Sequence, residues 1–68
     1  MAKSLIKLIA PKNYAHKGEV SWINPDDASL VFYENQVTVV ELRNGSKVFS
    51  MDTLDNVVKL INDNASHQ

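Results

Sequence analysis

The 68-residue chain contains no cysteine and only two glycines. Without thiols it can form neither a disulfide framework nor a thiolate metal site, and this favours a reducing, cytoplasmic setting. Gly18 and Gly45 are too few for a glycine-rich phosphate loop. No uninterrupted apolar run is long enough for a signal peptide or a membrane span, so we expect no membrane partner.

Catalytic constellations are also missing from the sequence. The only imidazoles, His16 and His67, lie in a predicted loop and in the C-terminal tail, which argues against a histidine-based zinc site. The serine and threonine hydroxyls have no base beside them in sequence. Asp26 and Asp27 are typical of a turn, because the spaced acidic pattern and the bidentate glutamate of a calcium loop are absent. We therefore predict a non-enzymatic protein with no catalytic residues, no metal and no cofactor.

The charges are unevenly distributed along the chain, although the net charge is only −1. Four lysines precede the first acidic residue, so the N-terminal quarter is basic and the remainder acidic. The length indicates one small domain, which we place at residues 1–62, with a frayed tail at residues 63–68. Because a core of this size stabilises a fold only marginally, self-association is a common remedy, and we expect a homo-oligomer.

The stretch from Gln36 to Ile61 predicts a strand, a tight turn, a second strand and a helix. Asn44-Gly45 favours a two-residue hairpin loop, because both central residues of such a loop need positive φ. That loop would place Val40 opposite Phe49 on the two strands. One face of the hairpin would then carry Val40, Leu42, Phe49 and Met51.

An amphipathic helix should follow the hairpin. Asp52 or Thr53 can act as its N-cap. Its apolar residues recur at helical spacing and form one stripe, which consists of Leu54, Val57, Val58 and Ile61. If this stripe packs on the sheet, Val58→Asp should unfold the domain.

The first half of the chain contributes further strands. Ser4 to Ala10, Glu19 to Ile23 and Ala28 to Glu34 have strand-like patterns, and Asn24-Pro25-Asp26-Asp27 is typical of a turn. The predicted fold is α+β, a twisted antiparallel sheet of three to five strands with one C-terminal helix packed on one face. The first strands and Trp22, which we expect in the core, either close the sheet into a partial small barrel or leave its second face open.

The second face of that sheet is the main candidate site. It would display apolar residues that are poorly suited to a solvated surface, namely Val31, Tyr33, Val37, Val39 and Val48. We interpret these residues as a protein interface, filled by another copy or by a partner that the sequence does not identify. An exposed strand edge is a second possible contact.

Nucleic-acid binding is the alternative function. Lys12, Tyr14, His16 and Lys17 share one loop, where lysines could neutralise phosphates and the tyrosine could stack on a base. Against this, the chain as a whole lacks the basic footprint of a dedicated nucleic-acid binder.

The order of elements from Ile23 to Ile61 resembles that of the small flagellar FlbD-like proteins and similar short bacterial and phage proteins. The similar features are Asn24-Pro25 after a short strand, Asn44-Gly45, and the valine-containing helix after Asp52-Thr53. The resemblance implies a small cytoplasmic accessory protein without catalysis, and it assigns no site residues. The small size and the lack of catalytic chemistry would also fit an inhibitor-type protein from a phage.

Overall fold

The computed structural model describes residues 5–13 and 16–66. The elements in chain order are β1 (Ile6–Ile9), β2 (Val20–Ile23), the 3-10 turn η1 (Pro25–Asp27), β3 (Ala28–Glu34), β4 (Val37–Leu42), β5 (Lys47–Ser50) and α1 (Leu54–Asn64). β1 and β2 form an antiparallel ribbon, and β3, β4 and β5 form an antiparallel sheet in that order. The predicted α+β class is confirmed, and the two sheets do not close into a barrel.

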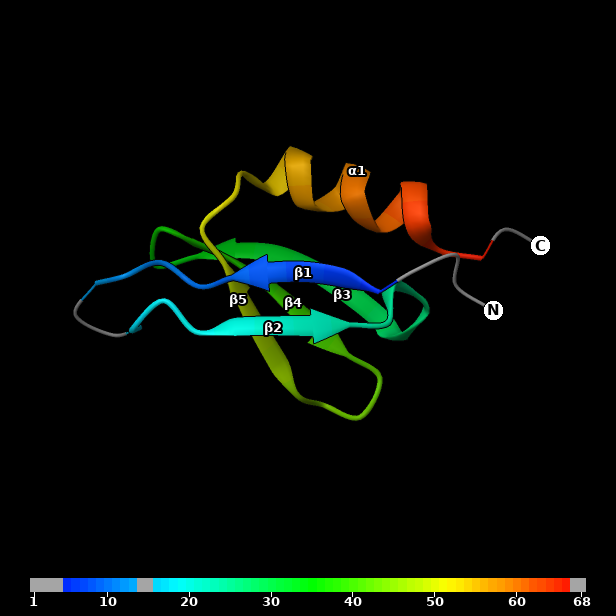
Figure 1. Ribbon diagram of the computed structural model, residues 1–68, viewed down its shortest axis with the longest axis horizontal. Helices are drawn as coiled ribbons and strands as arrows, with labels where there is room; N and C mark the ends of the chain where they lie inside the picture. The colour runs from blue at the N-terminus through cyan, green and yellow to red at the C-terminus, as the bar shows by residue number, and fades with distance from the viewer. Residues whose placement is uncertain (1–4, 14–15, 67–68) are drawn as a thin grey trace.

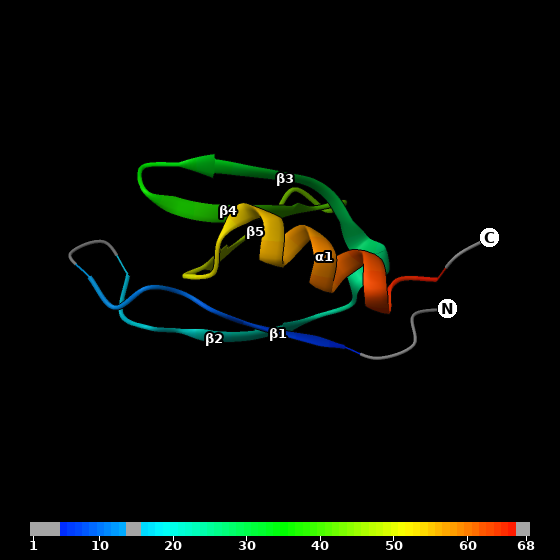
Figure 2. The same ribbon diagram turned by 90° about the horizontal axis from the view of Figure 1, so that it is seen from above.

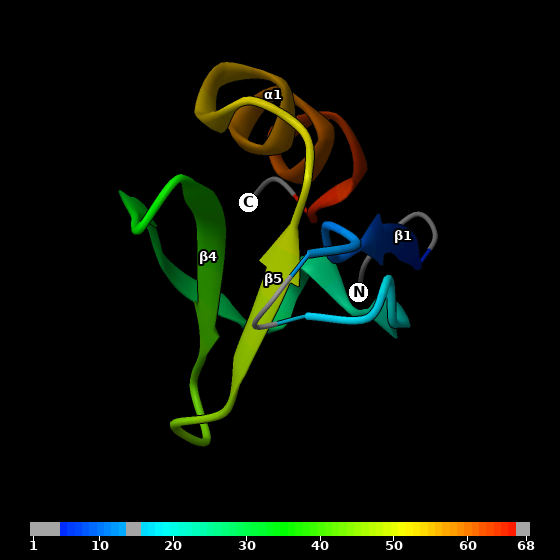
Figure 3. The same ribbon diagram turned by 90° about the vertical axis from the view of Figure 1, so that its left-hand side faces the viewer.

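The ribbon, the sheet and the helix share one core. Figure 1 shows α1 lying along one side of the strands, and Figure 2 shows the three-stranded sheet and the ribbon on opposite sides of it. A single backbone hydrogen bond of 2.8 Å, from Met51 N to Ile9 O, connects the ends of β5 and β1, and Figure 3 shows these elements side by side. The buried core cluster draws on all three parts: Ile6, Leu8, Ile23, Val40, Val57 and Ile61.

The helix begins where the sequence predicted. The Thr53 hydroxyl accepts a 3.2 Å hydrogen bond from Asn56 N and so caps the first turn. Val57 is fully buried, but its neighbour Val58 is 38% exposed. The prediction that Val58→Asp unfolds the domain therefore rested on the wrong valine, since the buried stripe is centred on Val57. The helix continues to Asn64, two residues into the segment expected to be frayed.

The β4–β5 hairpin differs from the prediction by one residue in register. Val39, not Val40, lies opposite Phe49, and Val40 lies opposite Val48. The loop has three residues, 43–45, because Gly45 N donates to Leu42 O and only Gly45 has a positive φ, of 89°. This is a turn followed by a left-handed glycine, the second common hairpin type. Phe49 consequently lies on the sheet face away from the core, and Met51 is exposed.

The two-residue turn with positive φ occurs instead between β3 and β4. Asn35 and Gln36 have φ values of 54° and 66°, and Glu34 lies opposite Val37 across the turn. A primed hairpin turn requires these conformations at both central residues. Asn35 tolerates the left-handed region, but Gln36 does not favour it, so the strain of this turn lies at Gln36.

Candidate functional site

The five predicted interface residues do not share one face. Val31 and Val48 each lie opposite Val40 in the sheet, and both pack against the core. Val37 and Val39 point to the other face but are buried, Val39 with only 3% of its surface exposed. Tyr33 is 59% exposed. The one-residue change in register explains the error for Val48, because it moves every β5 side chain to the opposite face.

The outer face of the three-stranded sheet has a shallow hollow of about 160 Å³. Phe32, Val39 and Phe49 cross it as direct neighbours on β3, β4 and β5, with Val39 as its floor. The His16 ring lies over this region, with its centroid 4.3 Å from that of Phe49. One of the aromatic rings that line the hollow is thus already in contact with a side chain of the protein itself.

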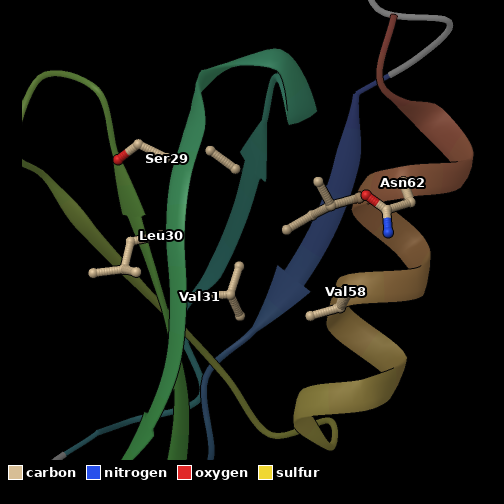
Figure 4. A pocket seen from close by; sticks show the side chains of 7 residues that line it. Ser29, Leu30, Val31, Val58 and Asn62 are labelled. Atoms are coloured by element: carbon tan, nitrogen blue, oxygen red, sulfur yellow. The ribbon is translucent and has the colours of Figure 1, made fainter. Parts of the chain in front are cut away.

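A second hollow, of about 190 Å³, lies between β3 and α1. Figure 4 shows Val31 and Val58 pointing toward each other across it, whereas Leu30 points away from the helix. Its lining offers no charged group: Ala28, Ser29, Leu30, Val31, Val58, Ile61 and Asn62. The hollow is mostly apolar, and Ser29 and Asn62 supply its only polar side chains.

The predicted basic loop is partly assembled. Lys12 and Lys17 are bridged across the hairpin arm, so their backbones lie side by side. His16 is held beside them, since its backbone N–H donates to the side chain of Asn13 at 2.8 Å. Tyr14, which was expected to stack on a base, lies outside the described residues. His16 contacts Phe49, so its ring is engaged by the protein itself.

Sequence reasoning missed the outer face of the β1–β2 ribbon. Strand alternation turns Ile6 and Ile23 inward and brings Lys7 and Trp22 together on the outside. Trp22 is 61% exposed, so its expected place in the core was wrong. The apolar members of this outer ribbon face are all exposed: Leu5, Ile9, Val20 and Trp22. The signal was present in the sequence. Leu5, Lys7 and Ile9 occupy every second position of the strand and so share one face, and the charge of Lys7 indicates that this face is exposed to solvent.

The ammonium group of Lys7 lies 5.9 Å from the centre of the Trp22 ring. This distance is within the range of a cation–π contact. Among the described residues, no carboxylate pairs with Lys7. The outer ribbon face therefore combines an exposed apolar surface with one positive charge that has no anionic partner in the described part of the chain.

The acidic turn has a structural role. Asp26 Oδ1 accepts a 2.7 Å hydrogen bond from Ser66 N, which joins the turn before β3 to the end of α1. This backbone hydrogen bond lowers the pKa of Asp26 below its ordinary value of 3.8, against a smaller opposing effect of desolvation. The adjacent Asn24 side chain accepts from Asp26 N at 3.0 Å, as the predicted turn requires. Across residues 5–13 and 16–66, no three His, Asp or Glu side chains are grouped to hold a metal ion.

Comparison with known proteins adds no assignment. The chain matches no family model, no curated protein and no solved structure. Within the described residues, α1 is too short and too polar to cross a membrane, and no other helix meets the requirements.

Proposed function

We propose that this protein is a non-enzymatic protein-binding module, a small cytoplasmic accessory or inhibitor-type protein of bacterial or phage origin. The resemblance to FlbD-like proteins supports the same class. The observation that carries the proposal is the outer ribbon face, where Trp22 and three aliphatic side chains are exposed together. Tryptophan is enriched among the residues that dominate binding energy at protein interfaces.

The contact surface proposed here differs from the one that the sequence suggested. Val37 and Val39 are buried, and Val31 and Val48 are partly buried against the core, so the four offer little exposed surface to a partner. The outer ribbon face is instead built on a scaffold that packs its other side into the core through Ile6, Leu8 and Ile23. A partner therefore meets a preformed surface.

Selection of binding peptides from a random library displayed on phage tests this proposal. We expect the wild-type protein to enrich related peptides and the Trp22→Ser variant to lose them. Tyr33→Ser is the matched control, because Tyr33 is also an exposed aromatic residue but lies on β3. Both variants should melt like the wild type. The proposal fails if the wild type enriches no peptides or if Trp22→Ser enriches the same ones.

The outer ribbon face can also bind a second copy of the same chain. Two copies can pair through β2, which would cover Val20 and Trp22 of each. Size-exclusion chromatography with light scattering decides this point. A dimer that dissociates in Trp22→Ser would support the homo-oligomer, and a monomer at high concentration would exclude it.

Nucleic-acid binding is the alternative function, and the bridged pair Lys12 and Lys17 is the observation that favours it. Two lysines held side by side form a local positive site for phosphate groups. The expected result is a salt-dependent mobility shift with single-stranded DNA or RNA that is lost in a Lys12→Gln, Lys17→Gln double variant. The absence of any shift at low salt would reject this alternative.

A further inference from the structure

β2 forms an open edge of the ribbon. β2 is hydrogen-bonded only to β1 among the described strands. Figure 1 shows β1 between α1 and β2, so β2 lies on the side of the ribbon away from the helix. An open strand edge offers unpaired backbone groups to another chain.

The hydrogen-bond pattern fixes which backbone groups face outward. Ala10 N donates to Glu19 O at 2.8 Å, which makes the next pair, Ile9 and Val20, a non-hydrogen-bonded pair. Hydrogen-bonded and non-hydrogen-bonded pairs alternate in an antiparallel ladder, so Lys7 and Trp22, two positions further along, also form a non-hydrogen-bonded pair. The N–H and C=O groups of Val20 and Trp22 therefore point away from β1. These are the two β2 residues whose side chains are exposed.

The other open edge, that of β3, is less suited to strand addition. Its pairing with β4 is irregular between Ala28 and Leu30, where Ser29 is the extra residue. Such bulges are a common means of protecting an edge. The helix α1 also lies against β3, with Val58 beside Val31. The β2 edge has neither form of protection.

The charges of the ribbon indicate the chemistry of its partner. The described ribbon residues, 5–13 and 16–23, include three lysines and one glutamate, a net charge of +2. The remaining described residues, 24–66, include seven acidic and three basic residues, a net charge of −4. Lys7 reaches across the ribbon to the Trp22 ring, toward the open edge. A strand added there would place its outward side chains beside Trp22 and within reach of Lys7.

We propose that the β2 edge binds an extended peptide segment of a partner protein in which apolar and acidic side chains alternate on one face. The peptide pairs with the backbone of Val20 and Trp22, sets an apolar side chain against these two residues, and directs a carboxylate to Lys7. This inference rests on the proposed protein-binding function and specifies its site and ligand class. Like charges on two ribbons disfavour a second copy as the occupant, and nucleic acid lacks the backbone groups that complete a strand edge.

A pair of synthetic peptides tests the proposal. The first alternates valine and glutamate at every second position, with threonine between them, and the second has glutamine in place of glutamate. Trp22 is the only tryptophan, so its fluorescence reports binding directly. We expect a saturable blue shift with the acidic peptide and about two- to fivefold weaker binding of the glutamine peptide, as for a solvent-exposed ion pair. Lys7→Glu should abolish or reverse this preference.

Two controls separate the site from general charge effects. Lys59→Glu makes the same charge change on α1 and should leave the preference unchanged. An acidic peptide that is N-methylated at the amides facing β2 should lose binding, because it cannot complete the ladder. Hydrogen exchange should slow at the amides of Val20 and Trp22 when peptide binds, and not at Tyr33.

Several outcomes would overturn the inference. These are equal binding of the two peptides, full binding of the N-methylated peptide, displacement by oligodeoxythymidine, or a Trp22-dependent dimer that excludes peptide. A failure of this inference can be distinguished from a failure of the proposed protein-binding function. If phage selection yields Trp22-dependent peptides without acidic residues, the protein-binding module stands and the acidic ligand class is wrong.

Discussion

The Thr38 hydroxyl donates a 2.8 Å hydrogen bond to the backbone carbonyl of Asp52. Thr38 lies in β4 and Asp52 in the connection between β5 and α1. Ser50, directly opposite Thr38, accepts a 3.1 Å bond from Asp52 N. Both hydroxyl-bearing residues are fully buried. Two neighbouring strands therefore hold both backbone groups of Asp52, which fixes where the chain leaves the sheet to begin α1.

Replacing Thr38 with valine tests this connection. Thr38→Val keeps the side-chain shape but leaves the Asp52 carbonyl without its donor, and we expect a loss of about 1–2 kcal/mol in the free energy of unfolding. Thr38→Ser, the control, keeps the hydroxyl and loses one methyl group, which should cost about 1 kcal/mol. Urea unfolding measures both. Equal or greater stability of Thr38→Val than of the wild type would contradict the proposed role.

Val57 and Val58 provide a matched pair for the helix. Val57 is fully buried and Val58 is 38% exposed. Val57→Asp should abolish cooperative folding, because burying an unpaired carboxylate costs more than the roughly 3–5 kcal/mol that a domain of this size has available. Val58→Asp should retain a cooperative melt. Thermal unfolding followed by circular dichroism checks both, and loss of folding in Val58→Asp alone would contradict this packing.

Adding a glycine to the β3–β4 turn and removing the glycine from the β4–β5 turn should have opposite effects on stability. Gln36 has a φ of 66° and an exposed side chain, so Gln36→Gly should raise stability by up to about 1 kcal/mol, as relief of backbone strain exceeds the entropy lost. Gly45 has a φ of 89°, and a Cβ there would meet no atom within 4 Å. Gly45→Ala should therefore cost about 1–2 kcal/mol through backbone strain alone. Denaturant unfolding measures both changes. A loss of stability in Gln36→Gly, or no loss in Gly45→Ala, would show that the turn concerned has a different conformation.

The sequence sufficed to predict the elements but not the register of the β4–β5 hairpin. The bounds of β3 and the Thr53 cap follow from turn residues and capping chemistry, which are local. The hairpin register does not, because Asn44-Gly45 suits both a two-residue loop and a three-residue loop ending in a left-handed glycine. β5 carries adjacent apolar residues, Val48 and Phe49, so either register turns one of them toward the core. The choice depends on packing against distant residues.

Trp22 illustrates a second limit of sequence reasoning. Trp22 and Ile23 are consecutive in β2, so only one can face inward. Ile23 packs there with Ile6 and Leu8, and the larger aromatic residue is left outside. A preference for burying large aromatics thus gave the wrong answer. The candidate site was missed for the same reason.

The Asp26–Ser66 hydrogen bond should make stability depend on pH in the acid range. The pKa of Asp26 is lowered in the folded protein, chiefly by the backbone hydrogen bond from Ser66. A carboxylate of this kind stabilises the fold above its unfolded-state pKa, and that contribution is lost as the pH falls through the lower folded-state pKa. Asp26→Asn should remove this part of the pH dependence. Carboxyl chemical shifts would contradict the interaction if Asp26 titrated at or above its ordinary value of 3.8.

The fluorescence of Trp22 distinguishes an exposed ribbon face from a buried one. Because the indole is 61% exposed, emission from a dilute sample should peak near that of free indole and shift little when urea unfolds the protein. Acrylamide should quench the native and unfolded forms to a similar extent. A strongly blue-shifted native emission that persists on dilution would place the indole inside the protein and remove the proposed surface. A blue shift that appears only at high concentration would instead show that copies of the chain cover Trp22, because only an intermolecular contact responds to dilution.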